Sequence, residues 1–197
     1  SAGTLNISGG GLNISGGYAS ASAYRNAGSG NTVSGTNSAT NHRNVAVSAK
    51  TLVVDGDINV DGGEGNAYTS GMGDYQATAQ SLATLTAKSR LTTNSGGLYV
   101  NGGSVYASHN GSGVGAPAAD ASATVNSAVV NVSGDVYLNG GSAYTFTSGT
   151  GAPKADANAS ILMGEGAKTM TVGGSLNLYG GFTDFTGAGT PSAYALI

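Results

Sequence analysis

Short segments in which apolar and polar residues alternate, each closed by two glycines, recur five times along the chain. The copies span residues 12–17, 58–63, 98–103, 136–141 and 176–181. The first glycines of successive pairs are 46, 40, 38 and 40 residues apart. This near-constant spacing indicates a repeat array, in which a unit buries its apolar face only by stacking on its neighbours. The repeat glycines are Gly16, Gly17, Gly62, Gly63, Gly102, Gly103, Gly140, Gly141, Gly180 and Gly181.

A second apolar segment precedes each motif by six or seven residues, as Leu52 and Val54 precede Ile58 and Val60. That distance is too short for a helix and suits two strands separated by a bend. Downstream of the glycines, alanine alternates with polar residues at 119–125 and 155–161, which predicts a narrow interior between two closely spaced sheets. Residues 75–85 also fit a helix, but their β-branched content and their alignment with the other copies favour a strand.

We therefore predict an all-β fold, a parallel β-helix or β-solenoid of about five units of roughly 40 residues. The approximate units are 1–49, 50–89, 90–127, 128–166 and 167–197. Each unit is either one flattened coil of about 40 residues or two coils of about 20, giving a rod roughly 25 Å or 50 Å long at ~4.8 Å between strands. We favour the single coil because the two halves of a unit do not resemble each other.

In-register stacking aligns equivalent side chains into ladders, which stabilise stacked parallel strands. The first expected ladder, a candidate surface, contains Asn13, Asn59, Tyr99, Tyr137 and Asn177. The second contains Ser15, Asp61, Asn101, Asn139 and Tyr179.

The composition narrows the class of protein. There are 35 Gly, charged residues make up 9% and Cys and Trp are absent. The glycines follow no three-residue period, which excludes collagen, and regular apolar alternation argues against a disordered coil. A net charge of −3 without a basic cluster predicts no nucleic-acid partner, and no apolar run approaches the ~20 residues that cross a bilayer. The absence of Cys is compatible with export, and we interpret the chain as a processed form or an excerpt of a longer repeat protein.

Few residues are candidates for chemistry. Asp55, Asp57 and Asp61 resemble a calcium loop, but the Glu of an EF-hand is missing, so we interpret them as solvated turn carboxylates. His42 and His109 lie in polar segments, and we expect both in surface loops. We therefore predict no enzyme, no metal, no cofactor and no catalytic residue.

The alternating Leu-x-Val-x-Gly-Gly strands, the Leu-x-Val-x-Gly segments before them, the lack of Cys and the Gly/Ser/Asn/Ala bias together resemble the repeat regions of large bacterial exoproteins. The most similar are filamentous-haemagglutinin-like adhesins of two-partner secretion and autotransporter passengers. This resemblance implies a secreted, right-handed parallel β-helix on the bacterial cell surface, acting as a stalk, adhesin or biofilm matrix fibre.

The leading functional hypothesis is an extracellular structural protein, either an adhesin stalk or a self-assembling fibre whose partner is another copy, bound end to end or laterally. The segment 5–17 is expected to pair with the exposed last coil of another copy, because no charged or Pro-rich cap shields either end. A first alternative is a carbohydrate-binding module, with Tyr99, Tyr137 and Tyr179 stacking on the sugars of polysaccharides or cell-surface glycans. A second is a polysaccharide-degrading β-helix enzyme with paired carboxylates drawn from Glu64, Glu165 and eight Asp.

Overall fold

The alternating apolar residues form strands in every repeat, and each strand pairs with its equivalent one repeat away. A computed structural model describes residues 2–25, 36–164, 168–186 and 189–197. Ile58 pairs in parallel with Leu98, and Leu98 pairs in parallel with Val136. Because equivalent residues in adjacent rungs are 40 or 38 positions apart, one repeat makes one turn of the coil. The predicted all-β parallel solenoid is confirmed, and each unit is the single flattened coil.

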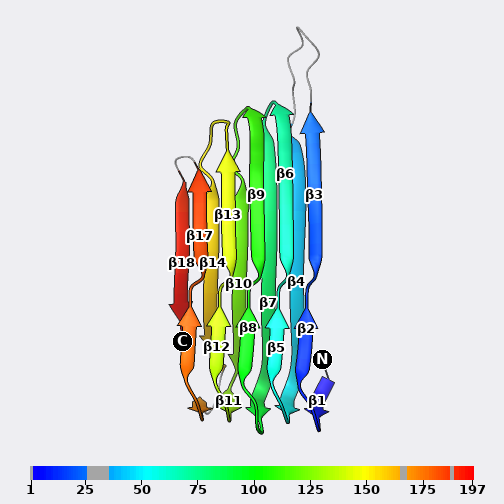
Figure 1. Cartoon of the computed structure of the whole chain (residues 1–197), viewed down its shortest axis with the longest axis vertical. Helices are drawn as coiled ribbons and strands as arrows, with labels where there is room; N and C mark the ends of the chain where they lie inside the picture. Colours follow the sequence, from blue (N-terminus) through cyan, green and yellow to red (C-terminus); the bar gives the residue numbers. More distant parts are fainter. Residues whose placement is uncertain (1, 26–35, 165–167, 187–188) are drawn as a thin grey trace.

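Each turn of the coil contributes to three parallel sheets, which we call A, B and C (Figure 1). Sheet A contains β1 (Ala2–Ile7), β4 (Asn37–Val54), β7 (Tyr75–Thr93), β10 (Ala118–Ser127), β11 (Val129–Val132), β14 (Lys154–Leu162), β15 (Thr169–Val172) and β18 (Thr190–Leu196). Sheet B contains β2 (Leu12–Ser15), β5 (Ile58–Asp61), β8 (Leu98–Asn101), β12 (Val136–Asn139) and β16 (Leu176–Tyr179). Sheet C contains β3 (Tyr18–Arg25), β6 (Glu64–Met72), β9 (Ser104–Ser112), β13 (Ser142–Thr147) and β17 (Phe182–Thr186).

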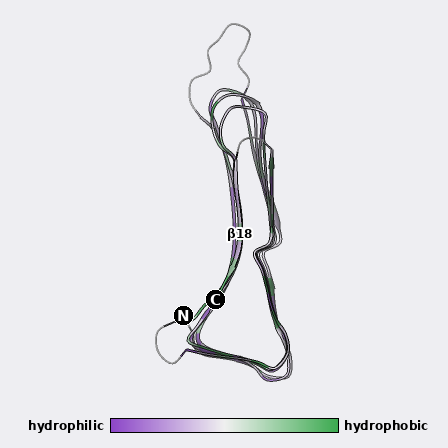
Figure 2. Ribbon diagram, turned by 90° about the vertical axis from the view of Figure 1, so that its left-hand side faces the viewer, coloured by the Kyte–Doolittle hydropathy of each residue, from purple (hydrophilic) through white to green (hydrophobic). Residues whose placement is uncertain are grey.

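Seen along the stacking axis, the coil is narrow at one end and triangular at the other (Figure 2). Sheet A bends where the register between β4 and β7 shifts, at Ala49 to Thr51. We call the residues of sheet A before this bend its long arm and those after it its short arm. The long arm faces sheet C in the narrow part, whereas both arms and sheet B enclose the triangular part (Figure 2).

A single chain is a slab rather than the expected rod. The wall formed by β8 and β9 runs from Leu98 to Ser112, about 50 Å at ~3.3 Å per residue. Five rungs at ~4.8 Å stack to only about 20–25 Å. The longest axis of the molecule therefore lies along its strands and not along the stack (Figure 1). A rod of this cross-section requires further coils on either end.

The two parts of the coil have different cores. The triangular part is filled by large aliphatic side chains, among them Leu52, Leu98 and Leu138, which are fully buried. The apolar side chains that line the narrow part are almost all alanine, including Ala79, Ala121 and Ala157. Buried Thr69, Tyr75 and His109 lie in the same part. The alternating alanines line a narrow interior, as predicted from the sequence, because small side chains let the two sheets approach closely.

The repeat glycines form the corner between sheets B and C, opposite the long arm of sheet A. A Cβ at Gly102 would lie 2.6 Å from the backbone N of Ser122 in β10 and 2.3 Å from the carbonyl O of Gly140 in the next rung. The second glycine of each pair has a left-handed backbone, with φ of +83° at Gly103. The first glycine therefore permits a narrow waist, and the second permits the turn into sheet C. This waist is the notch visible in the outline of the coil (Figure 2).

Candidate functional site

The outer face of sheet B carries the two ladders considered in the sequence. Register pairs Asn13 with Asn59, Asn59 with Tyr99, Tyr99 with Tyr137 and Tyr137 with Asn177. The same registers align the second set, Ser15, Asp61, Asn101, Asn139 and Tyr179. Both sets point outward, because the residues that alternate with them are core residues.

A polar groove runs along the outside of the glycine corner, parallel to the stacking axis. It encloses about 630 Å³ and crosses four rungs. The second ladder of sheet B forms one side, the first residues of the sheet C strands form the other, and the second glycines form the floor. The lining residues are Ser15, Gly17, Tyr18, Asp61, Gly63, Glu64, Asn101, Gly103, Ser104, Asn139, Gly141 and Ser142.

Hydrogen bonds to the corner hold the polar side chains of this groove in place. Asp61 accepts from the backbone N–H of Gly63 at 2.6 Å, and Asn139 accepts from that of Gly141 at 3.0 Å. Asn101 Nδ2 donates to the second oxygen of Asp61 at 2.8 Å, linking two rungs. Each carboxylate oxygen of Asp61 therefore accepts one hydrogen bond from the protein and can accept another.

An aromatic ledge adjoins the groove. Tyr99 and Tyr137 occupy adjacent rungs, and each is 37% exposed. The ring of Tyr99 lies against Gly97, where an added Cβ would be 2.7 Å from Cε2 and from the hydroxyl oxygen. The two tyrosines line a second hollow of about 420 Å³ that shares Asp61, Asn101 and Asn139 with the groove. Groove and ledge form one continuous surface, which we call the corner groove.

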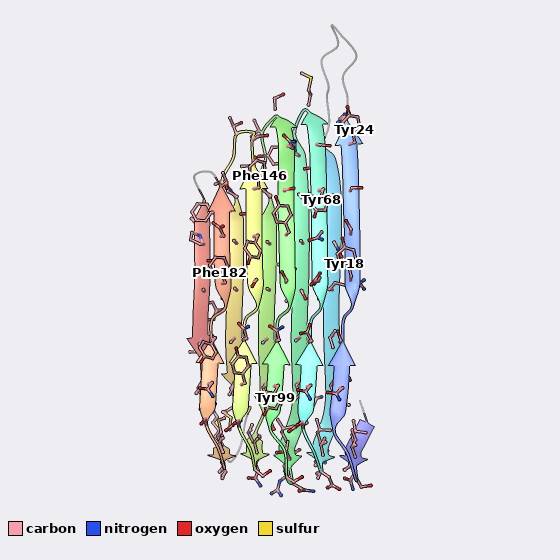
Figure 3. The ribbon with its side chains drawn as sticks, viewed as in Figure 1. Tyr18, Tyr24, Tyr68, Tyr99, Phe146 and Phe182 are labelled. Carbon is pink, nitrogen blue, oxygen red and sulfur yellow. The ribbon has the colours of Figure 1, made fainter. Side chains whose placement is uncertain are left out.

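Aromatic side chains also cross the outer face of sheet C, the face seen in Figure 3. Tyr68 contacts Tyr106 with ring centroids 5.6 Å apart, and Tyr144 contacts Phe182 at 5.5 Å. Tyr106 and Tyr144 are register partners, so these four residues form an oblique band over four rungs. Aromatic residues at the surface of this protein are thus concentrated on sheets B and C.

The two end faces of the stack expose side chains that are core residues elsewhere. Leu176 in the last rung of sheet B is 41% exposed, whereas its register partner Val136 is fully buried. In the first rung Ile14 is 36% exposed, whereas its partner Val60 is 1% exposed. These residues are exposed because no described rung covers them, and not because their positions in the coil face outward.

The carboxylates that resembled a calcium loop link rungs. Asp55 accepts from the backbone N–H of Gly9 at 2.8 Å and from Asn94 Nδ2 at 2.6 Å. These hydrogen bonds, that from Gly9 first, lower the pKa of Asp55 below its usual value. Asp57 accepts from Gly97 N–H at 2.7 Å. Asp55 and Asp57 lie between β4 and β5 as expected, but Asp61 is the last residue of β5, so its expected turn position is wrong. The hydrogen bonds of these carboxylates to neighbouring rungs were not anticipated. No group of three His, Cys, Asp or Glu able to hold a metal occurs among the described residues.

The prediction that both histidines lie in loops is wrong. His42 is exposed but lies within β4, and His109 lies in β9 and is 1% exposed. The ring of His109 stacks on Tyr75 at 3.6 Å between centroids. Its Nδ1 is 3.1 Å from Thr69 Oγ1, which also lies 3.3 Å from the Ser108 carbonyl oxygen, so the tautomer of His109 decides which atom donates in the first contact.

Burial lowers the pKa of His109, and its Nε2 has no hydrogen-bond partner in the described part of the chain. Sequence reasoning missed this residue because a polar stretch, Ser108 to Asn110, encloses it. The alternation of inward and outward residues along the strand could have identified it, because His109 follows Val105 and Ala107 at every second position, and both of these point inward.

No family model, no curated protein and no solved structure matches the chain. Of the described residues, none belongs to a helix with the length and apolar character needed to cross a membrane. The fold defines the class of protein, a parallel β-solenoid. Glu165, one of the two glutamates considered for catalysis, lies outside the described residues.

Proposed function

We propose that this protein is a structural building block whose copies stack end to end into a fibre, acting outside the cell on a bacterial surface or in a matrix. The observation that carries the proposal is the complementarity of the two end faces. One face presents β15, β16, β17 and β18, and the other presents β1, β2, β3 and the long arm of β4. Every edge is a parallel strand, a template for another strand.

Three series of hydrogen bonds define how the next rung would bind. In the first, the backbone N–H of Leu98 donates to the Asp135 carbonyl and that of Val136 to the Ser175 carbonyl. Leu176 N–H is the next donor in this series. At the other end of the series, the N–H of Leu12 in the first rung donates to the Asp57 carbonyl in the second rung. Gly11 is the equivalent of Asp57 in the first rung, so its carbonyl is the acceptor that the first rung offers to a preceding copy. Stacked copies would therefore join Leu176 N–H to the Gly11 carbonyl.

The other two series run along the glycine corner. Gly140 N–H donates to the Tyr179 carbonyl, and the equivalent bond at a junction joins Gly180 N–H to Ser15 of the next copy. In the opposite direction, Phe182 N–H donates to the Gly141 carbonyl. The N–H of Tyr18 in the next copy would likewise donate to the Gly181 carbonyl.

Side chains match across this junction. The last strand of sheet B reads Leu-Asn-Leu from Leu176, and the first reads Leu-Asn-Ile from Leu12. Stacking would continue the aliphatic core and place Asn177 on Asn13.

In sheet A, the strand of one copy that ends the stack would lie beside the first long strand of the next copy. Successive parallel registers align Leu196 with the position of Ala46, by way of Ser160, Thr124 and Thr84. β1 pairs with β4 only from Ala49 onward. β18 of one copy and β1 of the next would therefore share the edge of β4 without overlap.

The size of the contact is adequate for specific association. A coil about 50 Å long with walls about 10 Å apart presents roughly 500–700 Å² per face, or more than about 1,000 Å² in total, near the lower end of specific interfaces. Such a contact is heterologous, and heterologous contacts that do not close generate filaments. The Gly/Ser/Asn/Ala composition, which resembles that of large bacterial exoproteins, supports placement outside the cell, and the absence of Cys is compatible with it.

Tyr18→Pro tests the junction, with Tyr18→Ala as its matched control. Tyr18 is the first residue of β3, a position where strands accept proline. Proline removes the outward N–H and restricts φ at this position, whereas alanine keeps the N–H. Loss of this donor costs about 1–3 kcal/mol per junction, which raises the critical concentration for assembly about 5- to 150-fold. Pelleting by ultracentrifugation and negative-stain microscopy measure the effect.

The expected wild-type material is fibres about 50 Å wide. A wild-type chain that stays monomeric at high concentration would refute end-to-end stacking. Equal assembly of the proline and alanine variants would show that the junction uses other groups.

A further inference from the structure

We propose that the corner groove binds a neutral, linear polysaccharide lying parallel to the stacking axis. This inference goes beyond the fibre and does not depend on it, because four rungs of one chain line the groove. It assigns a binding role to a surface that stacking leaves uncovered.

The chemistry of the lining suits a carbohydrate. Sugars present hydroxyl groups at their edges and C–H groups on their ring faces. The groove offers carboxylate, amide and hydroxyl groups from Asp61, Asn101, Asn139 and Ser104, and the ledge offers the rings of Tyr99 and Tyr137. An amphipathic tyrosine ring packs a C–H face while its hydroxyl remains in water.

The repetition of the lining suits a polymer rather than a single small ligand. A carboxyl or amide group recurs in the same ladder at Asp61, Asn101 and Asn139, once per rung. Rungs repeat every ~4.8 Å, a step close to the length of one sugar residue in an extended chain. A polymer along the axis therefore meets equivalent groups at successive residues.

The groove is also fixed before binding. Hydrogen bonds from Gly63, Asn101 and Gly141 hold the side chains of Asp61 and Asn139 in place, and Gly97 lets the Tyr99 ring lie close to the sheet. A polar site built in this way loses little conformational entropy on binding.

Charge selects the class of polysaccharide. Asp61 and Glu64 are the charged residues of the lining, and both are acidic. The chain as a whole carries a net charge of −3. An acidic polysaccharide would be repelled, so the ligand expected is neutral.

Affinity electrophoresis tests the proposal, using native gels that contain hydroxyethylcellulose or, for comparison, alginate. Samples are cleared of fibres by ultracentrifugation, so that failure to bind and failure to assemble are measured separately. The wild-type chain is expected to be retarded by hydroxyethylcellulose and not by alginate. Tyr99→Ala combined with Tyr137→Ala is expected to weaken binding about tenfold or more.

Tyr24→Ala is the matched control, because Tyr24 is 71% exposed on sheet C and does not line the groove. It is expected to leave the retardation unchanged. Ser104→Trp is a second variant that fills the groove without removing a ledge tyrosine, and it should also abolish retardation. Circular dichroism checks that each variant is folded.

Three outcomes would overturn the proposal. They are no retardation of wild type by hydroxyethylcellulose, equal retardation by alginate, or a loss with Tyr24→Ala as large as with the ledge variant. Association of wild-type chains side by side without retention by the polysaccharide would show that the groove binds another copy instead.

Discussion

At the scale of single residues, His109 is the least expected feature of the chain. It contacts Tyr75 and Thr69, and its Nε2 has no hydrogen-bond partner among the described residues. Protonation would place a charge inside the coil, with an Nε2–H that has no hydrogen-bond partner among the residues that the structure describes. Burial therefore lowers the pKa of His109 below its ordinary value of 6.5.

This shift predicts loss of stability in mild acid. Above pH 6.5 the histidine is neutral in folded and unfolded chains alike. Below that pH the unfolded chain binds a proton that the folded chain does not, so stability falls as pH drops toward the folded pKa, by at most about 1.4 kcal/mol per pH unit. Urea unfolding between pH 7 and pH 5 measures the slope.

His109→Phe provides the control for that slope. Phenylalanine keeps a ring against Tyr75 and removes the titrating group, so its stability should be flat over the same interval. The lowered pKa of Asp55 affects stability only below about pH 4, where the unfolded chain takes up a proton at Asp55 before the folded chain does. An unchanged slope in His109→Phe would mean that another group titrates.

At the scale of elements, the glycine corner decides the cross-section of the coil. It narrows the interior between sheet C and the long arm of sheet A and separates the alanine core from the aliphatic core. It also creates the corner groove on the outside of the same turn. One pair of glycines per rung therefore shapes both the interior and the surface.

Gly102→Ala should destabilise the chain strongly. Its Cβ would lie 2.3 Å from the Gly140 carbonyl O and 2.6 Å from Ser122 N, both of them backbone atoms. Relieving the clash requires sheets to move apart, at a cost of about 3 kcal/mol or more. Gly3→Ala in β1, where an added Cβ has no atom within 4 Å, should change stability by less than about 0.5 kcal/mol. Urea unfolding of both variants measures their free energies of unfolding. Equal stabilities of the two variants would contradict tight packing at the waist.

The repeat elements were predictable from the sequence because their physical causes are local. Alternation fixed the strands, and the recurring glycines fixed register, so the ladder through Tyr99 and Tyr137 follows directly. The inward position of His109 and the bend at Ala49 depend on how a turn closes in three dimensions. The corner groove was missed for the same reason: its sides, Asn101 and Ser104, are close in sequence, but the hollow arises only from the angle between their sheets.

At the scale of the whole molecule, the chain is a slab whose two end faces expose apolar side chains of the core type. Leu176 and Ile14 are exposed in the terminal rungs, whereas the equivalent residues of the inner rungs, Val136 and Val60, are buried. End-to-end stacking would cover both and would turn the slab into a column whose width is the length of the coil.

Asn13→Asp combined with Asn177→Asp should block this assembly at neutral pH. Both residues point outward, and stacking would place the two new carboxylates directly opposite each other, where like charges destabilise pairing. Assembly should return when the pH falls below about 4 and the carboxylates are protonated. Each single variant leaves an Asn opposite the new Asp and should still assemble. Light scattering against pH measures this; a double variant that assembles at pH 7 would exclude the proposed register.

The complementarity of the end faces has a consequence for length. Each added copy covers one end face of the column and leaves an identical end face free. The geometry of stacking therefore sets no limit on the number of copies. Column lengths would then be broadly distributed and would follow the supply of subunits. A defined length would require a separate terminator.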